Sequence, residues 1–103
     1  MNQYRQGDVL LVRVDELPGK IEEIDREKGR LVLARGEATG HAHVVRERRS
    51  RLVRDAEGET FLDVAAPAKL EHEEHGPIAL EPGVYKVIRQ REYSQAEVRF
   101  VAD

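Results

Sequence analysis

The stretch Val9–Val14, which reads VLLVRV, decides the fold class of this chain. It follows a Gly-Asp turn signal and ends shortly before a Leu-Pro-Gly turn. Because successive side chains of a strand point to opposite faces, Leu10, Val12 and Val14 share one face and the arginine points the other way. The stretch therefore predicts a half-buried β-strand.

The rest of the chain repeats this pattern, with short runs rich in Val, Ile and Leu separated by Gly, Pro or charged clusters. Such spacing is typical of an all-β sandwich or barrel. We expect further strands at residues 20–25, 30–35, 41–47, 51–55, 60–64, 78–80, 84–91 and 98–101. Residues 65–75 are ambiguous, because alanine and glutamate favour a helical turn while Pro67 and Pro77 favour a strand or an irregular loop.

The links between these segments predict how the strands pair. The expected hairpins join 20–25 to 30–35, 41–47 to 51–55, and 51–55 to 60–64. The length and the hydrophobic content suit one modest core. We therefore predict an all-β, mainly antiparallel fold, a small β-barrel or sandwich, with residues 1–103 as a single domain.

The composition limits the classes of function. Of the 103 residues 36% are charged, yet the net charge is only −3, so both signs are interspersed. This argues against a DNA-binding domain driven by bulk charge. No stretch reaches the roughly 18 apolar residues of a membrane span, and residues 1–6 lack the apolar run of a signal peptide. We expect a soluble, cytoplasmic protein without a membrane partner.

The histidines carry the strongest functional signal. All four, His41, His43, His72 and His75, fall in two closely spaced pairs, and the chain has no cysteine. Any metal must therefore be held by imidazole, carboxylate or backbone oxygen. On a strand, His41 and His43 would point to the same face and could bind one ion. His72 and His75 share a face only where the backbone turns, so one of them could be uninvolved.

We expect the two pairs to meet at one site that binds about one equivalent of a divalent transition metal, namely Zn, Fe, Mn, Ni or Cu. Nitrogen-rich ligand sets suit these metals better than Mg or Ca, which prefer oxygen. Two alternatives stay open. One is a metal-free polar or catalytic site, and the other is no site at all, because single histidines in polar loops are ordinary.

Carboxylates and arginines accompany the histidines. The nearby acidic residues are Glu47, Glu71, Glu73 and Glu74. They offer a fourth ligand, a general base or a hydrogen-bonding partner, unless they are simply solvated. The basic run is Arg46, Arg48, Arg49, Arg51 and Arg54. It suits either contact with a phosphate or a solvated hairpin edge, whereas the few aromatic residues give little support to a nucleic-acid platform.

Two resemblances bear on this site. His41-Ala42-His43 followed by Glu47 resembles the first metal motif of the cupin family, which implies a metal bound by two histidines and a later glutamate inside a small β-barrel. The chain carries no histidine after Glu81-Pro82-Gly83, where a cupin would have one.

The second resemblance extends over nearly the whole chain. The segments that carry it are Gln6–Val9, Gly40–His43, Glu74–His75 and Gln90–Tyr93. In these segments the chain is similar to a family of small uncharacterised bacterial and phage proteins. The resemblance implies no activity.

Three hypotheses of function follow. The first is a histidine-coordinated metal that activates water for hydrolysis or polarises a small-molecule substrate. The second is a non-catalytic binding module in which a closed, four-ligand metal stabilises a loop. The third is metal-free acid–base chemistry on RNA or a phosphoester, with arginines holding phosphate. Whether the chain is an enzyme, and whether it forms a homodimer, stays open.

Overall fold

The structure is a computed structural model, and it describes residues 2–36 and 40–90. The named elements in this part of the chain are all β-strands. They are β1 (Gln3–Gln6), β2 (Val9–Val14), β3 (Ile21–Ile24), β4 (Leu31–Arg35), β5 (Ala42–Val45), β6 (Arg51–Asp55), β7 (Thr60–Val64), β8 (Ala68–Glu71), β9 (Ile78–Leu80) and β10 (Gly83–Arg89).

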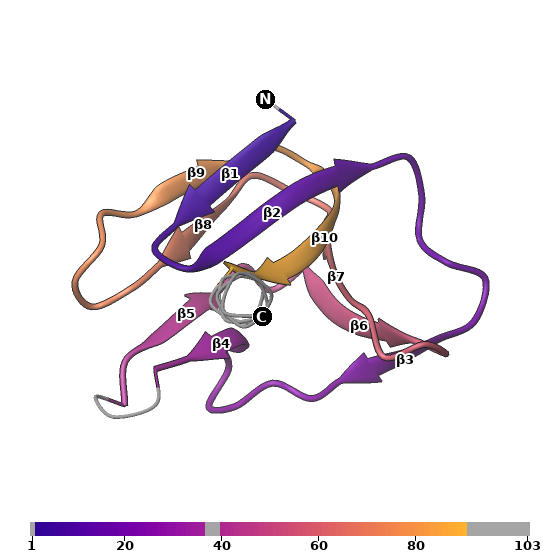
Figure 1. The fold of residues 1–103 in the computed structure, drawn as a ribbon, viewed down its shortest axis with the longest axis horizontal. Coiled ribbons are helices and arrows are strands. Elements are labelled where there is room, and N and C mark those ends of the chain that lie inside the picture. The colour runs from indigo at the N-terminus through magenta and orange to yellow at the C-terminus, as the bar shows by residue number, and fades with distance from the viewer. Residues whose placement is uncertain (1, 37–39, 91–103) are drawn as a thin grey trace, which may run out of the picture.

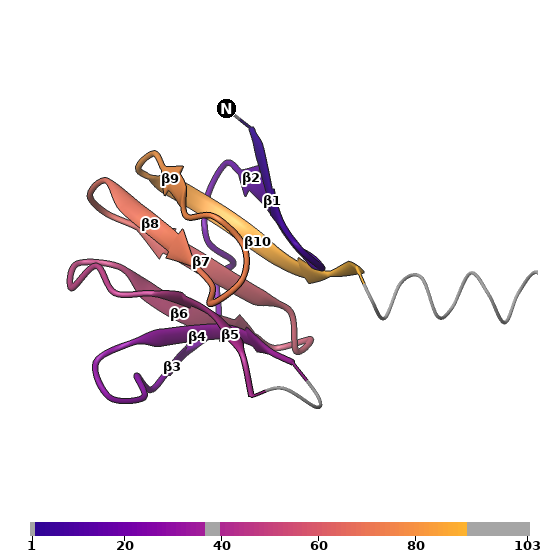
Figure 2. The ribbon, with the colours of Figure 1, turned by 90° about the vertical axis from the view of Figure 1, so that its left-hand side faces the viewer.

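The strands form two antiparallel sheets (Figures 1 and 2). The larger sheet has the order β1-β2-β10-β7-β6-β3 and the smaller one the order β4-β5-β8-β9. In Figure 1 the smaller sheet lies on the left, and β7, β6 and β3 of the larger sheet lie on the right. The sheets do not close into a barrel. The predicted all-β antiparallel fold is confirmed, in its sandwich form.

One hydrophobic cluster joins the two sheets. The larger sheet contributes Leu11, Leu62 and Tyr85 to it, and the smaller sheet contributes Leu31 and Leu70, all with at most 1% of their surface exposed. Burying a side chain of this size stabilises the fold by about 1.5–3 kcal/mol. The cluster therefore holds the smaller sheet, and the loops at its ends, in a fixed position against the larger one.

Strand β2 lies where the sequence predicts it. The face that carries Val9 and Leu11 is more buried than the face that carries Leu10, Val12 and Val14. Val9 and Leu11 are fully buried, whereas Leu10, Val12 and Val14 are half-buried. Both faces of this strand carry aliphatic side chains, so alternation alone does not identify the face that meets the core.

The turn between β3 and β4 corrects the first predicted hairpin. Lys28 and Gly29 have positive φ angles of 53° and 79°, and Glu27 and Arg30 exchange two backbone hydrogen bonds of 2.8 and 3.0 Å. This is a tight reversal of the kind that joins hairpin strands. Nevertheless β3 pairs with β6 and β4 pairs with β5, in different sheets. The turn reverses the chain locally but does not determine which sheet receives the next strand.

The second predicted hairpin is also wrong, and this correction positions the site. Strand β5 pairs with β4 and β8, while β6 pairs with β3 and β7. In the β5–β8 ladder Val44 lies opposite Glu71 and Val45 opposite Leu70. One further step in the same register brings His43 next to His72. The pairing with β8 therefore draws the two histidine pairs together.

The remaining predictions have mixed outcomes. The β6–β7 hairpin and a strand at 78–80 are confirmed. The ambiguous segment 65–75 contains strand β8 followed by an irregular loop. The predicted strand at 98–101 lies outside the described residues. Within residues 2–36 and 40–90 no helix is long and apolar enough to cross a membrane.

Candidate metal centre

The four imidazole rings form one cluster. His41 immediately precedes β5, His43 lies within it, and His72 and His75 lie in the loop after β8. The ring centroids of His41 and His72 are 5.6 Å apart, those of His43 and His72 4.3 Å, and those of His72 and His75 4.7 Å. The rings of the two pairs therefore lie side by side. The prediction that at least three of the four imidazoles bind one ion stays a prediction, because the described residues with donor atoms all within 4.8 Å of one another are two histidines, His41 and His72, and Glu73.

The cluster runs from the surface into the protein. The side chain of His41 is 30% exposed, whereas that of His43 is only 5% exposed. His43 lies on β5, whose four residues are all buried because both neighbouring strands and the core cover them. A buried imidazole requires hydrogen-bonding partners, and the β1–β2 turn supplies them.

Gln6 fixes the orientation and the protonation of His43. The buried Gln6 amide donates from Nε2 to the backbone carbonyls of Leu70 and Gly76, both at 2.9 Å. Its Oε1 must then be the atom that lies 2.8 Å from His43 Nδ1. Because an amide oxygen only accepts, His43 Nδ1 carries a proton and donates it. In the neutral ring Nε2 is therefore the nitrogen with the free electron pair.

The Nε2 atom of His43 faces Asp8. It lies 3.3 Å from Asp8 Oδ1, and the other oxygen of the same carboxylate lies 3.7 Å from a guanidinium nitrogen of Arg89. Burial lowers the pKa of His43 from its ordinary 6.5, and His72 lowers it further, while the Asp8 carboxylate raises it. Desolvation outweighs the carboxylate here, so the neutral ring is favoured.

This pKa shift predicts a pH dependence of stability. Because the folded state disfavours protonated His43, the contribution of this group is fully present above pH 6.5 and is lost as the pH falls toward the lowered value. The free energy of unfolding of chelator-treated protein should fall by up to about 1.4 kcal/mol per pH unit in this range. Urea unfolding between about pH 7.5 and about pH 5.5 measures it. A stability that rises on acidification would contradict the assignment.

His41 has a similar arrangement on the exposed side of the cluster. Its Nδ1 lies 3.2 Å from Glu74 Oε1. The carboxylate accepts, so Nδ1 carries the proton and Nε2 has the electron pair. A ring nitrogen held by a carboxylate, with the other nitrogen presented as a ligand, is the usual arrangement of a metal-bound histidine.

His72 has the opposite arrangement. Its Nδ1 accepts hydrogen bonds from the backbone N–H groups of Glu74 at 3.0 Å and of His75 at 3.3 Å. The neutral ring therefore carries its proton on Nε2. To bind a metal, His72 must either give up these loop hydrogen bonds or release that proton. Metal binding by His72 therefore costs hydrogen bonds that hold the loop.

Glu73 provides a carboxylate close to His41 and His72. Its Oε1 accepts a hydrogen bond of 2.9 Å from the backbone N–H of Ala42, and this bond is the largest cause of the lowered pKa of Glu73. One donor atom from each of His41, His72 and Glu73 lies within 4.8 Å of the other two. These three residues are a candidate ligand set.

Gly7 packs against the cluster from the β1–β2 turn. Its φ of +58° is one that L side chains rarely adopt. A Cβ atom at this position would lie only 2.7 Å from His75 Nε2 and 3.3 Å from His43 Cε1. The lack of a side chain at this position therefore allows both imidazole rings to pack directly against the turn.

Several residues near the histidines in the sequence have other partners. Glu47 accepts hydrogen bonds from the backbone and side chain of Arg49, at 2.9 and 3.1 Å, and Glu71 pairs with Arg46 at 3.4 Å. The cupin-like role of Glu47 has no counterpart in these contacts. Arg51 pairs with Asp63 at 3.0 Å.

Residues 5–90 match the domain of unknown function DUF8820. The chain belongs to the DUF8820 family. No curated protein and no solved structure matches the chain. The match spans the whole histidine cluster and the β1–β2 turn, so the site is part of the DUF8820 domain. An uncharacterised family is thus shown, while the similarity to cupins is unsupported by any match.

Sequence reasoning missed three residues of this site in the DUF8820 domain, namely Gln6, Gly7 and Asp8. Gly7 and Asp8 are interpretable locally as a turn, which they also form. Their contacts with the histidines cross more than thirty residues of chain, so no local pattern reveals them. One feature of the sequence could have indicated these residues: Gln6–Val9 is among the segments that resemble the family of small uncharacterised bacterial and phage proteins.

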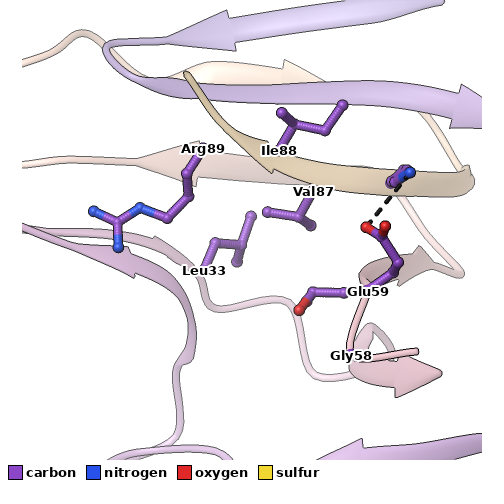
Figure 3. A pocket seen from close by; sticks show the side chains of 8 residues that line it. Leu33, Gly58, Glu59, Val87, Ile88 and Arg89 are labelled. Carbon is purple, nitrogen blue, oxygen red and sulfur yellow. Dashed lines mark ion pairs between the residues drawn. The ribbon is translucent and has the colours of Figure 1, made fainter. Parts of the chain in front are cut away.

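One hollow adjoins the DUF8820 site, and a second is connected to it, among the described residues, only through Arg89. A cavity of about 220 Å³ is lined by His72 and Glu73 together with Arg30 and Arg46. A larger one, of about 500 Å³, lies along β10 (Figure 3). There the Lys86–Glu59 ion pair of 3.4 Å stands at one end, and Arg89, which also approaches Asp8, extends away from it.

Proposed function

We propose that this domain binds a divalent transition metal ion at His41, His72 and Glu73. The observation that supports it is the close approach of three donor atoms from these residues, all within 4.8 Å of one another. They come from two segments more than thirty residues apart. Imidazole and carboxylate are the ligands that such metals take in proteins without cysteine.

The donor atoms would have to move slightly inward to bind an ion. With metal–donor bonds of about 2.1 Å, two ligands of one ion are at most about 4.2 Å apart. The observed spread of up to 4.8 Å is a little larger. Rotation of side chains that are partly exposed can remove this difference, since Glu73 is exposed and His41 and His72 are half-buried.

The surroundings favour a metal with an open coordination position. Three protein ligands leave room for a water molecule, and His72 and Glu73 line the cavity of about 220 Å³ beside them. Arg30 and Arg46 in the same lining would favour a small substrate with an anionic group. Activation of that water for hydrolysis, or polarisation of the substrate, is the chemistry such a site supplies.

Metal titration of protein purified without an affinity tag tests the proposal. Calorimetry and elemental analysis should show binding of Zn²⁺, Mn²⁺, Ni²⁺ or Fe²⁺. The substitutions His41→Ala and Glu73→Gln should each weaken binding at this site at least tenfold, or about 1.4 kcal/mol. Glu57→Gln, which changes an exposed glutamate in the β6–β7 turn, is the matched control and should leave the affinity unchanged.

The same titration distinguishes the alternatives. Native protein that binds none of these ions would rule the proposal out and favour metal-free chemistry at the histidines. X-ray absorption that finds four protein ligands and no water would favour the non-catalytic module with a structural metal.

A further inference from the structure

We propose a second cation site, formed by His43 Nε2 and Asp8 Oδ1 with His75 as the next ligand. It lies on the buried side of the cluster, where His43 is covered by the β1–β2 turn. It does not depend on the ion proposed at His41, His72 and Glu73, because it uses none of those residues.

Two acceptor atoms, His43 Nε2 and Asp8 Oδ1, face each other on the buried side of the cluster. The Gln6 amide keeps the proton of His43 on Nδ1, which leaves an electron pair on Nε2. Asp8 presents a carboxylate oxygen to that electron pair at 3.3 Å. Two acceptors at this distance attract each other only when a proton or a metal ion lies between them, and burial of His43 disfavours its protonated form.

The distance between His43 Nε2 and Asp8 Oδ1 suits two ligands of one ion. In a tetrahedral site with bonds of about 2.0–2.1 Å, two ligand atoms are about 3.3 Å apart. The distance of 3.3 Å between His43 Nε2 and Asp8 Oδ1 matches this edge. The pair therefore has the spacing of two ligands that share one ion, before any movement of the side chains.

The rings of His75 and His43 pack directly against Gly7. His75 Nε2 and His43 Cε1 approach the same point, the position of a Cβ at residue 7, to 2.7 and 3.3 Å. The two rings are nearly parallel, with an interplanar angle of 18° and centroids 6.1 Å apart. Glycine thus keeps His75 next to the Asp8–His43 pair. His75 is therefore the candidate for a third nitrogen ligand. Its ring would have to move inward, because among the described residues only His41, His72 and Glu73 have donor atoms that all lie within 4.8 Å of one another.

Gln6 is the positioning residue of this site. It touches no ion in the proposed arrangement, but it selects which nitrogen of His43 has the electron pair. The same amide anchors the loop that carries His72 and His75 through the carbonyls of Leu70 and Gly76. One side chain therefore orients His43 and holds the neighbouring loop.

Counting bound ions in paired variants tests the second site. Tag-free protein titrated with Zn²⁺ should bind two ions per chain. Asp8→Asn, which keeps the shape and removes the charge, should lose one of them, and His41→Ala should lose the other. Asp25→Asn, at an exposed position after β3, is the matched control and should keep both. Thermal melts in chelator should verify that every variant is folded.

The outcomes separate the two proposals. If Asp8→Asn still binds as many ions as the native protein, the second site is overturned. A single ion that His41→Ala loses and Asp8→Asn keeps would overturn the second site and leave the first. A single ion that Asp8→Asn loses and His41→Ala keeps would overturn the first alone.

Nitrogen NMR of the His43 ring provides an independent readout. Addition of Zn²⁺ should shift the Nε2 resonance of His43 and leave Nδ1 protonated. Gln6→Met should remove this preference for one nitrogen, which a merely structural role would not predict. A His43 ring with both nitrogens protonated at neutral pH, and unchanged by Zn²⁺, would show that a proton lies between His43 and Asp8 and would overturn the site.

Discussion

Replacing Gln6 with alanine is expected to lower the free energy of unfolding by about 3 kcal/mol. The Gln6 side chain makes three hydrogen bonds, to the carbonyls of Leu70 and Gly76 and to His43 Nδ1, and it is only 3% exposed. A hydrogen bond contributes about 1 kcal/mol, and a buried partner left without one costs about 1–3 kcal/mol. This is a large share of the roughly 5–15 kcal/mol that stabilises a domain.

Urea unfolding followed by circular dichroism measures this change. Gln3→Ala is the matched control, because Gln3 is an exposed glutamine on the same strand. It should change the free energy of unfolding by no more than about 0.5 kcal/mol. Equal effects of the two substitutions would mean that the three hydrogen bonds of Gln6 do not hold the turn, the loop and His43 together.

Replacing Gly7 with alanine is expected to damage both stability and the histidine cluster. A positive φ costs an L residue about 1–2 kcal/mol. The φ of Gly7 is +58°, and its new Cβ would also lie 2.7 Å from His75 Nε2. The imidazole must therefore move away, which also separates His75 from His43. We expect a loss of about 2 kcal/mol or more in stability and weaker Zn²⁺ binding at the Asp8–His43 site.

Gly58→Ala separates the effect of the positive φ from the effect of the contact between the new Cβ and His75. Gly58 also has a positive φ, +85°, but nothing lies within 4 Å of the place where its Cβ would be. It should lose only the conformational part of the stability and keep the native affinity for Zn²⁺. If Gly7→Ala binds Zn²⁺ as tightly as Gly58→Ala does, the packing of the histidine rings against Gly7 has no role in the site.

The strands of this fold are predictable because their signal is local. Alternating aliphatic residues bounded by Gly, Pro and charged clusters identify β2, β7 and β9 without reference to any other part of the chain. Which strands pair with one another cannot be predicted from such local signals. The Lys28-Gly29 turn has the backbone angles of a hairpin, yet it joins strands of different sheets. Core packing of distant strands decides this assignment, and no short segment encodes it.

The candidate site also has a part that the sequence predicts and a part that it does not. The clustering of His41 with His43 and of His72 with His75 is visible in the sequence, whereas the meeting of the pairs depends on the pairing of β5 with β8, which the sequence does not indicate. The residues that determine the protonation and orientation of the histidines cannot be identified from the sequence. Gln6 acts on His43 across 37 residues and on Gly76 across 70. A glutamine near the start of the chain has no composition or spacing that indicates such a contact.

The topology also sets the time at which the cluster can form during synthesis. The β1–β2 turn leaves the ribosome first, but the carbonyl of Gly76 that Gln6 binds is made 70 residues later, and β10, which pairs with β2, comes later still. Folds dominated by such distant contacts form slowly, over milliseconds to seconds. A nascent chain therefore presents the four histidines as two separate pairs. The complete site, in which Gln6 and Asp8 contact His43, exists only after the two sheets have come together, so any ligand that requires these contacts binds a chain that has already folded.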